Sequence, residues 1–135
     1  MDIINILRDK ILNIVNELVE DKNFKQPINI NNIVVERPKR QNQGDYSTNA
    51  AMVLGKALSY NPRDLGEIII FKLIDGELIN NVSLDGPGFL NITINPKFWD
   101  RLIVEIVTNT YKYGQISFGS GKKVNLEFVS ANPTG

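Results

Sequence analysis

Three polar side chains near the C-terminus, Glu127, Ser130 and Asn132, have types and spacing suited to binding a small molecule. The run 124–129 mixes apolar and β-branched residues and predicts a short strand, and Ser, Asn, Pro and Gly within 130–135 predict a polar turn after it. In doubly wound sheets, ligands bind at the turn that follows a strand's carboxyl end. A carboxylate, a hydroxyl and an amide would face one pocket there. A C-terminal edge strand without function is the alternative, and the pattern alone favours it.

A second candidate site lies on the strand expected at 89–94. Phe89 and Asn91 alternate with apolar residues, so the two side chains are expected on the face opposite the apolar one. An aromatic ring for stacking, beside an amide that donates and accepts, is the combination that reads looped RNA. The alternative is that Phe89 packs under a helix and Asn91 faces solvent. The residue pattern alone favours this alternative.

A cluster of positive charge is formed by Arg37, Lys39 and Arg40, with an amide-rich stretch at 41–44 directly after it. Clusters of this kind are usually solvated loops. The same residue types also suit contacts with a phosphate backbone, and this is the densest positive patch in the sequence.

Four helices are predicted to position these residues. They are expected at 2–22, from 44–49 to about 61, at 61–75 and at 95–113. The expected N-caps are Asp2, then one of Asp45, Ser47 or Thr48, then Asn61 and Asn95, the last two each followed by a proline. Phe71 is expected to face inward on the third helix, and Phe98, Leu102, Ile103, Ile106 and Val107 on the fourth, with Trp99 half-buried.

Strands are predicted at 33–35, 78–84 and 89–94, the last two joined by a glycine-rich turn at 85–88 that is typical of a hairpin. The fold class is therefore α+β. We expect two layers, with an antiparallel sheet of three or four strands covered by helices on one face and left open on the other.

Composition excludes several classes of site. Fifteen basic and fifteen acidic residues cancel, so any surface that binds nucleic acid must be local. The sequence contains no Cys and no His, which excludes disulfides and argues against a zinc site or a self-contained hydrolase. No apolar run approaches the roughly 20 residues that span a membrane.

Three stretches together resemble the arginyl-tRNA synthetase family. The residues 127–135, Glu-Phe-Val-Ser-Ala-Asn-Pro-Thr-Gly, resemble the segment that precedes that family's His-x-Gly-His ATP signature. The residues 44–49, followed by an alanine-rich helix and Pro62–Arg63, and the hairpin residues 86–91 resemble its N-terminal domain. The resemblance implies an N-terminal additional domain at 1–118, which binds the tRNA elbow. It also implies a linker and the first strand of a Rossmann-like catalytic domain, cut short, at 119–135.

The resemblance also implies residue roles. Phe89 and Asn91 would take a nucleotide of the tRNA D-loop, and Arg37, Lys39, Arg40 and Asn49 are further candidates for tRNA contact. Glu127 would pair with the guanidinium of the substrate arginine, and Ser130 and Asn132 would hold its amino-acid head.

The whole enzyme of that family attaches arginine to tRNA with ATP and Mg²⁺. This chain is expected to lack catalytic residues, metal sites and cofactor sites of its own, and to be inactive alone. A cytoplasmic monomer without membrane contact is expected. The competing hypotheses are a non-catalytic α/β protein-interaction module and a stand-alone RNA-binding domain.

Overall fold

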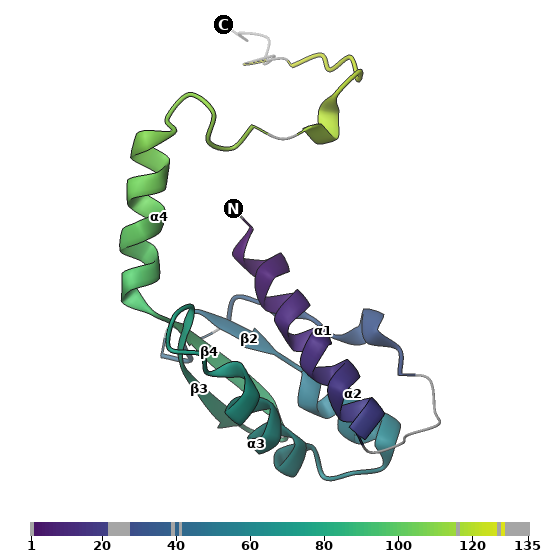
Figure 1. The fold of residues 1–135 in the computed structure, drawn as a ribbon. Helices are drawn as coiled ribbons and strands as arrows, with labels where there is room; N and C mark the ends of the chain where they lie inside the picture. The colour runs from purple at the N-terminus through teal and green to yellow at the C-terminus, as the bar shows by residue number, and fades with distance from the viewer. Residues whose placement is uncertain are drawn as a thin grey trace, which may run out of the picture.

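The computed structural model describes residues 2–21, 28–38, 40, 42–115, 117–126 and 128. The order of elements, shown in Figure 1, is α1 (Ile3–Asp21), η1 (Ile30–Asn32), β1 (Val35–Glu36), β2 (Tyr46–Thr48), α2 (Ala50–Leu58), α3 (Pro62–Leu73), β3 (Ile79–Asp85), β4 (Phe89–Ile94), α4 (Pro96–Thr108) and η2 (Ser117–Gly119). Here η denotes a 3₁₀ helix.

The four strands form one antiparallel sheet in the order β1-β2-β4-β3. The β3–β4 hairpin is the expected one, and a register shift between Ile79 and Asn81 marks an irregularity near the start of β3. Since β4 lies between β2 and β3, it is an interior strand. The expected fold class, α+β with helices on one face of an antiparallel sheet, is confirmed.

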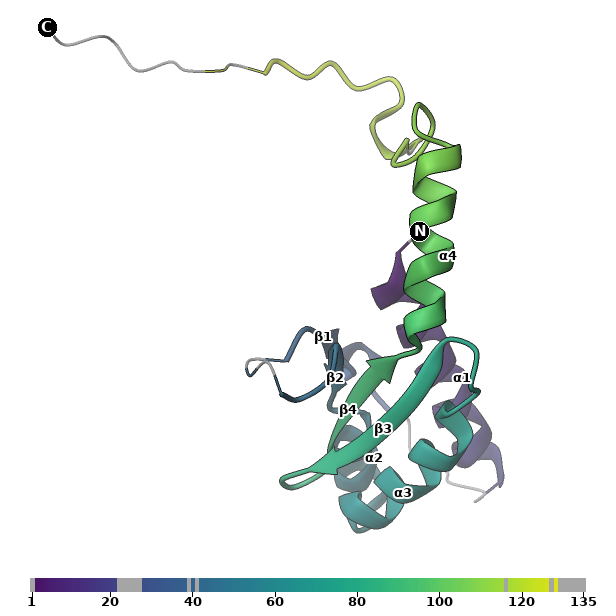
Figure 2. The same ribbon diagram turned by 90° about the vertical axis from the view of Figure 1, so that its left-hand side faces the viewer.

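Helices α1, α2 and α3 cover one face of the sheet (Figure 2). The core lies between these two layers. Its largest fully buried side chains come from α1, the segment before β1, α2, α3, β3 and β4, and they are Leu7, Ile11, Val15, Ile33, Leu54, Leu65, Ile69, Leu73, Ile79, Leu90, Ile92 and Ile94. The predicted apolar stripe of α1 is confirmed, and Asp2 Oδ1 accepts a hydrogen bond from Asn5 N (3.3 Å) at its start.

Two boundaries near the centre of the chain differ from prediction. The first strand was expected at 33–35 and is found at 35–36, because Val34 N donates to the side chain of Asn49 (2.9 Å) instead of to a neighbouring strand. The residues 44–49 were expected to open a helix. Instead, Tyr46–Thr48 is β2, which fills the space between β1 and β4, so Asp45 and Ser47 are not helix caps.

Helix α2 begins at Ala50, with Asn49 in the N-cap position but without a side-chain capping bond. The predicted Thr48 cap is also wrong, because Thr48 belongs to β2; its hydroxyl does accept a hydrogen bond from Ala50 N (3.3 Å). Helix α3 begins as predicted, with Asn61 accepting from Arg63 N (2.9 Å). Phe71, however, is 87% exposed, so the prediction that it faces the core is wrong.

Helix α4 extends away from the end of the sheet (Figures 1 and 2). Asn95 caps it as predicted, accepting from Lys97 N (3.0 Å), and Trp99 is half-buried as expected and meets Phe98 edge to face with ring centroids 5.9 Å apart. None of its residues is fully buried, and Ile103, Ile106 and Val107 are exposed, which overturns their predicted inward position. The amphipathic pattern is present, but among the described residues no second layer covers that part of the helix.

The described part of the expected C-terminal strand, residues 124–126 and 128, makes no sheet pairing. A strand is stabilised by hydrogen bonds to a neighbouring strand, and no strand of the four-stranded sheet pairs with these residues. No helix in the described part of the chain has both the length and the apolar character that crossing a membrane requires.

Candidate nucleic-acid interface

Polar side chains form a row across the open face of the sheet. The register pairs Glu36 with Ser47, Ser47 with Asn91, and Asn91 with Ser83, so one residue from each of the four strands contributes. Alternate residues of a strand point to opposite faces, and the neighbours of Asn91 in β4 are core residues. The row therefore lies on the face that α1, α2 and α3 leave uncovered.

Phe89 stands at the start of β4, directly after the hairpin turn, and is 39% exposed. None of the described helices seals it, so the prediction that its ring lies on the open face is consistent with the structure. The turn comes close to the helical layer at Gly88, where φ is +139° and an added Cβ would lie 3.0 Å from Pro62 Cβ and 3.1 Å from Met52 Cγ. Glycine is suited to this position, because other residues rarely adopt that φ.

Asn91 is only 7% exposed, and its side chain forms no hydrogen bond with the described residues. No fully buried side-chain N or O atom in that part of the chain lacks a partner, so the amide of Asn91 still reaches solvent. It does so in a hollow of the open face. The amide is thus held in place by packing and keeps its donors and its acceptor free for a ligand.

This first hollow has a volume of about 320 Å³. Its lining consists of Glu36, Pro38, Gln43, Ser47, Asp85, Phe89 and Asn91. Gln43 Nε2 donates to Asp85 Oδ2 (2.7 Å), which ties the loop before β2 to the end of β3. An aromatic ring, a free amide and a hydroxyl around one small hollow match the requirements of a stacked and hydrogen-bonded nucleobase.

Phe89 also borders a second hollow, of about 250 Å³. Its lining consists of Val34, Glu36, Ser47, Thr48, Asn49, Met52 and Phe89. Because three of these residues also line the first hollow, the two depressions adjoin at Phe89. The ring therefore stands between two concave parts of the same surface.

Two of the three predicted cationic residues, Arg37 and Arg40, line a third hollow of about 330 Å³ together with Trp99 of α4. Lys39 lies outside the described residues. Pro38 borders both this hollow and the first one, so the guanidinium groups belong to a surface next to the Phe89 site. The structure brings the predicted base-contacting and phosphate-contacting residues onto neighbouring surfaces.

The first of the comparisons with known proteins concerns residues 3–94, which match the family model described as the arginyl tRNA synthetase N terminal domain. This match covers more than half of the chain and contains the whole sheet and helices α1 to α3. The chain belongs to this family.

Curated relatives agree with the assignment to the synthetase N-terminal family. The chain is 44% identical over 119 residues to the arginine–tRNA ligase of Rhizobium etli (strain CIAT 652). This match covers 88% of this chain and 20% of the relative. It is 40% identical over 129 residues to the arginine–tRNA ligase of Jannaschia sp. (strain CCS1), covering 96% of this chain and 22% of the relative. The chain thus spans about a fifth of the length of these relatives.

Asn49 has a structural role in this synthetase domain that its sequence context did not reveal. Its amide donates to the carbonyl of Asn32 (3.0 Å) and accepts from Val34 N (2.9 Å). Both bonds fix the segment that leads into β1. Asn49 also borders the second hollow, so its predicted tRNA contact stays a prediction.

Two further side chains of the synthetase domain shape the interface, and sequence reasoning assigned them no such role. Asp45 Oδ2 accepts from Ile94 N (2.8 Å), which anchors the loop before β2 to β4. Arg63 Nη1 donates to the carbonyl of Gly86 (2.6 Å), which holds the hairpin turn against α3. The Pro62–Arg63 step was the only signal for the second contact.

The predicted arginine-binding residues Glu127, Ser130 and Asn132 all lie outside the described residues. Among the described residues, no three His, Cys, Asp or Glu side chains are grouped as a metal ion would require. The roles assigned to the three C-terminal side chains therefore stay predictions.

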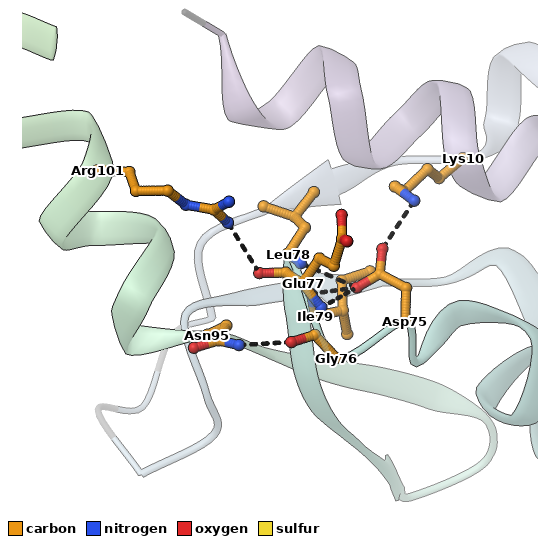
Figure 3. Close-up of polar contacts among 8 residues, drawn as sticks. All are labelled: Lys10, Asp75, Gly76, Glu77, Leu78, Ile79, Asn95 and Arg101. Carbon is orange, nitrogen blue, oxygen red and sulfur yellow. Dashed lines mark hydrogen bonds and ion pairs between the residues drawn. The ribbon is translucent and has the colours of Figure 1, made fainter.

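Among the described residues, Asp75 is the side chain whose pKa departs clearly from its ordinary value, and it lies between α1 and the start of β3 (Figure 3). Burial by itself raises the pKa of Asp75. The hydrogen bond from Lys10 (2.8 Å) and those from the backbone N–H groups of Ile79, Leu78 and Glu77 outweigh burial and lower the pKa from 3.8 to about 2.

The surroundings of Asp75 connect three elements of the synthetase domain. Lys10 belongs to α1, and the three backbone donors lead into β3. Asn95 Nδ2 donates to the carbonyl of Gly76 (2.6 Å) and Arg101 Nη2 to that of Glu77 (3.4 Å), so the start of α4 attaches to the same turn (Figure 3). This cluster holds α1, the start of β3 and the start of α4 together, and it is separate from the candidate interface.

Proposed function

We propose that this chain is the tRNA-contacting N-terminal part of an arginine–tRNA ligase, and that its open sheet face binds the D-loop at the tRNA elbow. The single observation that carries this proposal is the pairing of an exposed ring, Phe89, with a packed and unpartnered amide, Asn91. The family and the names of the relatives support the parent activity.

The proposed contact relies on stacking. A looped-out base places its face on the ring of Phe89 and its edge against the amide of Asn91. Stacking on an aromatic side chain contributes about 1–3 kcal/mol per base. An interior strand such as β4 supplies a rigid support, so little conformational entropy is lost when the base binds.

Phosphate contacts complete the proposed interface. Arg37 and Arg40 line the hollow that adjoins the base site at Pro38, and they take the RNA backbone beside the looped nucleotide. Lys39, which lies outside the described residues, is proposed to contact the same backbone. Guanidinium groups bind phosphate oxygens through paired hydrogen bonds, and such contacts position the RNA without reading its sequence.

The remaining functions belong to the full-length protein. There, Glu127 pairs with the guanidinium of arginine, and Ser130 and Asn132 hold its amino-acid head, while ATP and Mg²⁺ serve a catalytic domain beyond this chain. The 135-residue chain alone does not attach arginine to tRNA. It acts as a cytoplasmic monomer.

The proposal is tested by replacing the ring. Phe89→Ala should weaken binding of an arginine-acceptor tRNA transcript to the 135-residue chain by about 1–3 kcal/mol, because the stacking surface is lost. Asn91→Ala should also weaken it. Phe71→Ala is the matched control, since Phe71 is a more exposed phenylalanine on the helical layer. Dissociation constants are measured by fluorescence anisotropy at one fixed salt concentration.

Nuclease footprinting on the same transcript locates the contact, and protection is expected in the D-loop. Equal affinity for the wild type, Phe89→Ala and Asn91→Ala variants would reject the sheet face as the RNA site. Protection elsewhere on the tRNA, with Phe89 still required, would favour a general RNA-binding domain over the D-loop assignment. Absence of RNA binding altogether would favour a protein-interaction module.

A further inference from the structure

The first hollow carries more negative charge than a surface for RNA should. Glu36 and Asp85 both line it, next to Phe89 and Asn91. Asp85 is engaged by Gln43 at 2.7 Å. Glu36 is exposed and forms no hydrogen bond or ion pair with the described residues. A free carboxylate at this position repels phosphate and accepts hydrogen bonds only.

The neighbouring charges are separated by the strand geometry. Glu36 lines the first hollow, whereas Arg37, the next residue, lines the third hollow with Arg40. Successive residues in extended backbone point to opposite sides. Phosphate groups therefore have a cationic surface on one side of Pro38, and the base site on the other side has a carboxylate.

The polar row adds a second, independent feature. Glu36 pairs in register with Ser47, and Ser47 pairs with Asn91. Asn91 is 7% exposed, has no hydrogen-bond partner among the described residues and lines the hollow, so its amide is available to a ligand bound there. The three side chains together offer a carboxylate acceptor, a hydroxyl and an amide along one line.

We infer that Glu36 reads the edge of the base that stacks on Phe89, and selects a base with an exocyclic amino group over uracil. The inference rests on the proposed function and names the chemistry of its ligand. An amino group donates to the carboxylate, as in the pairing of Glu or Asp with cytosine N4. Uracil presents two carbonyl oxygens around its single imino N–H, and a carboxylate repels both.

Two pyrimidine oligonucleotides test the inference, because they differ at the amino group and have rings of the same size. Fluorescein-labelled pentacytidylate and pentauridylate are titrated with the 135-residue chain at fixed salt, with anisotropy as the readout. The wild type should bind pentacytidylate at least about fivefold more tightly than pentauridylate, the lower end of the discrimination that one base contact gives.

Glu36→Gln removes the charge with almost no change of shape and supplies an amide N–H group that can donate a hydrogen bond to a uracil carbonyl oxygen. The cytidylate-to-uridylate affinity ratio should then fall to about twofold or less. Glu67→Gln is the matched control: Glu67 is exposed on α3, in the helical layer, and its replacement changes the net charge equally. That variant should keep the wild-type ratio.

Equal binding of the two oligonucleotides by the wild type overturns the inference, as does a preference that survives Glu36→Gln. An equal gain in affinity for both oligonucleotides in Glu36→Gln also overturns it, because Glu36 then acts only through its charge. Failure of both to bind, while the tRNA transcript still binds in a Phe89-dependent manner, overturns the inference and leaves the proposed function intact. Loss of Phe89 dependence in the tRNA assay rejects the proposed function itself.

Discussion

Asn91 belongs both to the interior of the sheet and to the candidate site. Its place in an interior strand, between Ser47 of β2 and Ser83 of β3, explains why it is buried on a sheet face that none of the described helices covers. Neighbouring side chains immobilise the amide without using its hydrogen bonds. A group ordered before binding loses little entropy on binding, which favours recognition of one base edge.

Asp75 has a structural role, and its effect on stability should depend on pH. Its pKa in the folded protein is about 2, below the ordinary value of 3.8, so the ionised carboxylate stabilises the fold. The contribution is fully present above about pH 4 and is lost as the pH falls toward 2. Asp75→Asn should lower the free energy of unfolding by about 1 kcal/mol at pH 6, because the ion pair with Lys10 is removed.

Urea unfolding at pH 6, 3 and 2 measures this contribution. The difference between wild type and Asp75→Asn should shrink as the pH falls, since protonation removes the same charge in the wild type. Asp9→Asn is the control, because Asp9 is exposed on α1 and has no hydrogen bond with the described residues. A difference between wild type and Asp75→Asn that is constant from pH 6 to 2 would contradict this account of Asp75.

At the scale of the elements, the β3–β4 hairpin is fixed from both sides. Arg63 holds the turn from α3, and Asp45 holds β4 from the loop before β2. These contacts connect residues far apart in sequence, so they define where Phe89 stands relative to the helical layer. The glycine-rich turn alone would leave that position open.

The second half of helix α4, from Ile103 onward, should contribute little to the stability of the domain in this chain. Val107 is 69% exposed, whereas Leu90 in β4 is fully buried. Val107→Ser should change the free energy of unfolding by no more than about 0.5 kcal/mol, and Leu90→Ala should reduce it by about 2–5 kcal/mol. Denaturant titrations followed by circular dichroism compare the two variants. A large loss of stability in Val107→Ser would show that the second half of α4 packs against another part of the chain.

For the whole molecule, the net charge of zero means that RNA binding relies on a local group of cations. If Arg37 and Arg40 contact phosphates as proposed, the logarithm of the tRNA association constant should fall with the logarithm of salt concentration with a slope near about −2. The double variant Arg37→Gln with Arg40→Gln should bring this slope to between about −1 and 0.

The control for this salt experiment is Lys56→Gln with Lys112→Gln, which removes two positive charges from exposed positions outside the three hollows. Its slope should equal that of the wild type. The same reduction of slope in both double variants would indicate that overall charge, and no local site, governs the association.

The amino-acid sequence determined the helices that begin with an Asn–Pro cap, the apolar stripe of α1 and the alternation in β4. Each of these depends on residues within a few positions, so local rules suffice. The same alternation separated Phe89 and Asn91 from the core residues of β4. The resemblance of three short stretches indicated the family, which the match over 3–94 confirmed. The predicted domain boundary after residue 118 stays a prediction.

Only the tertiary structure decided which elements the remaining segments form and which side chains meet. Tyr46–Thr48 was expected to open a helix but forms a strand, because its backbone pairs with β1 on one edge and with β4 on the other. Phe71 and Val107 follow a helical apolar pattern but find no layer to pack against among the described residues. The row from Glu36 to Ser83 unites four strands whose pairing no local pattern encodes. Long-range pairing decides it, because hydrogen bonds between strands depend on register and sheet order.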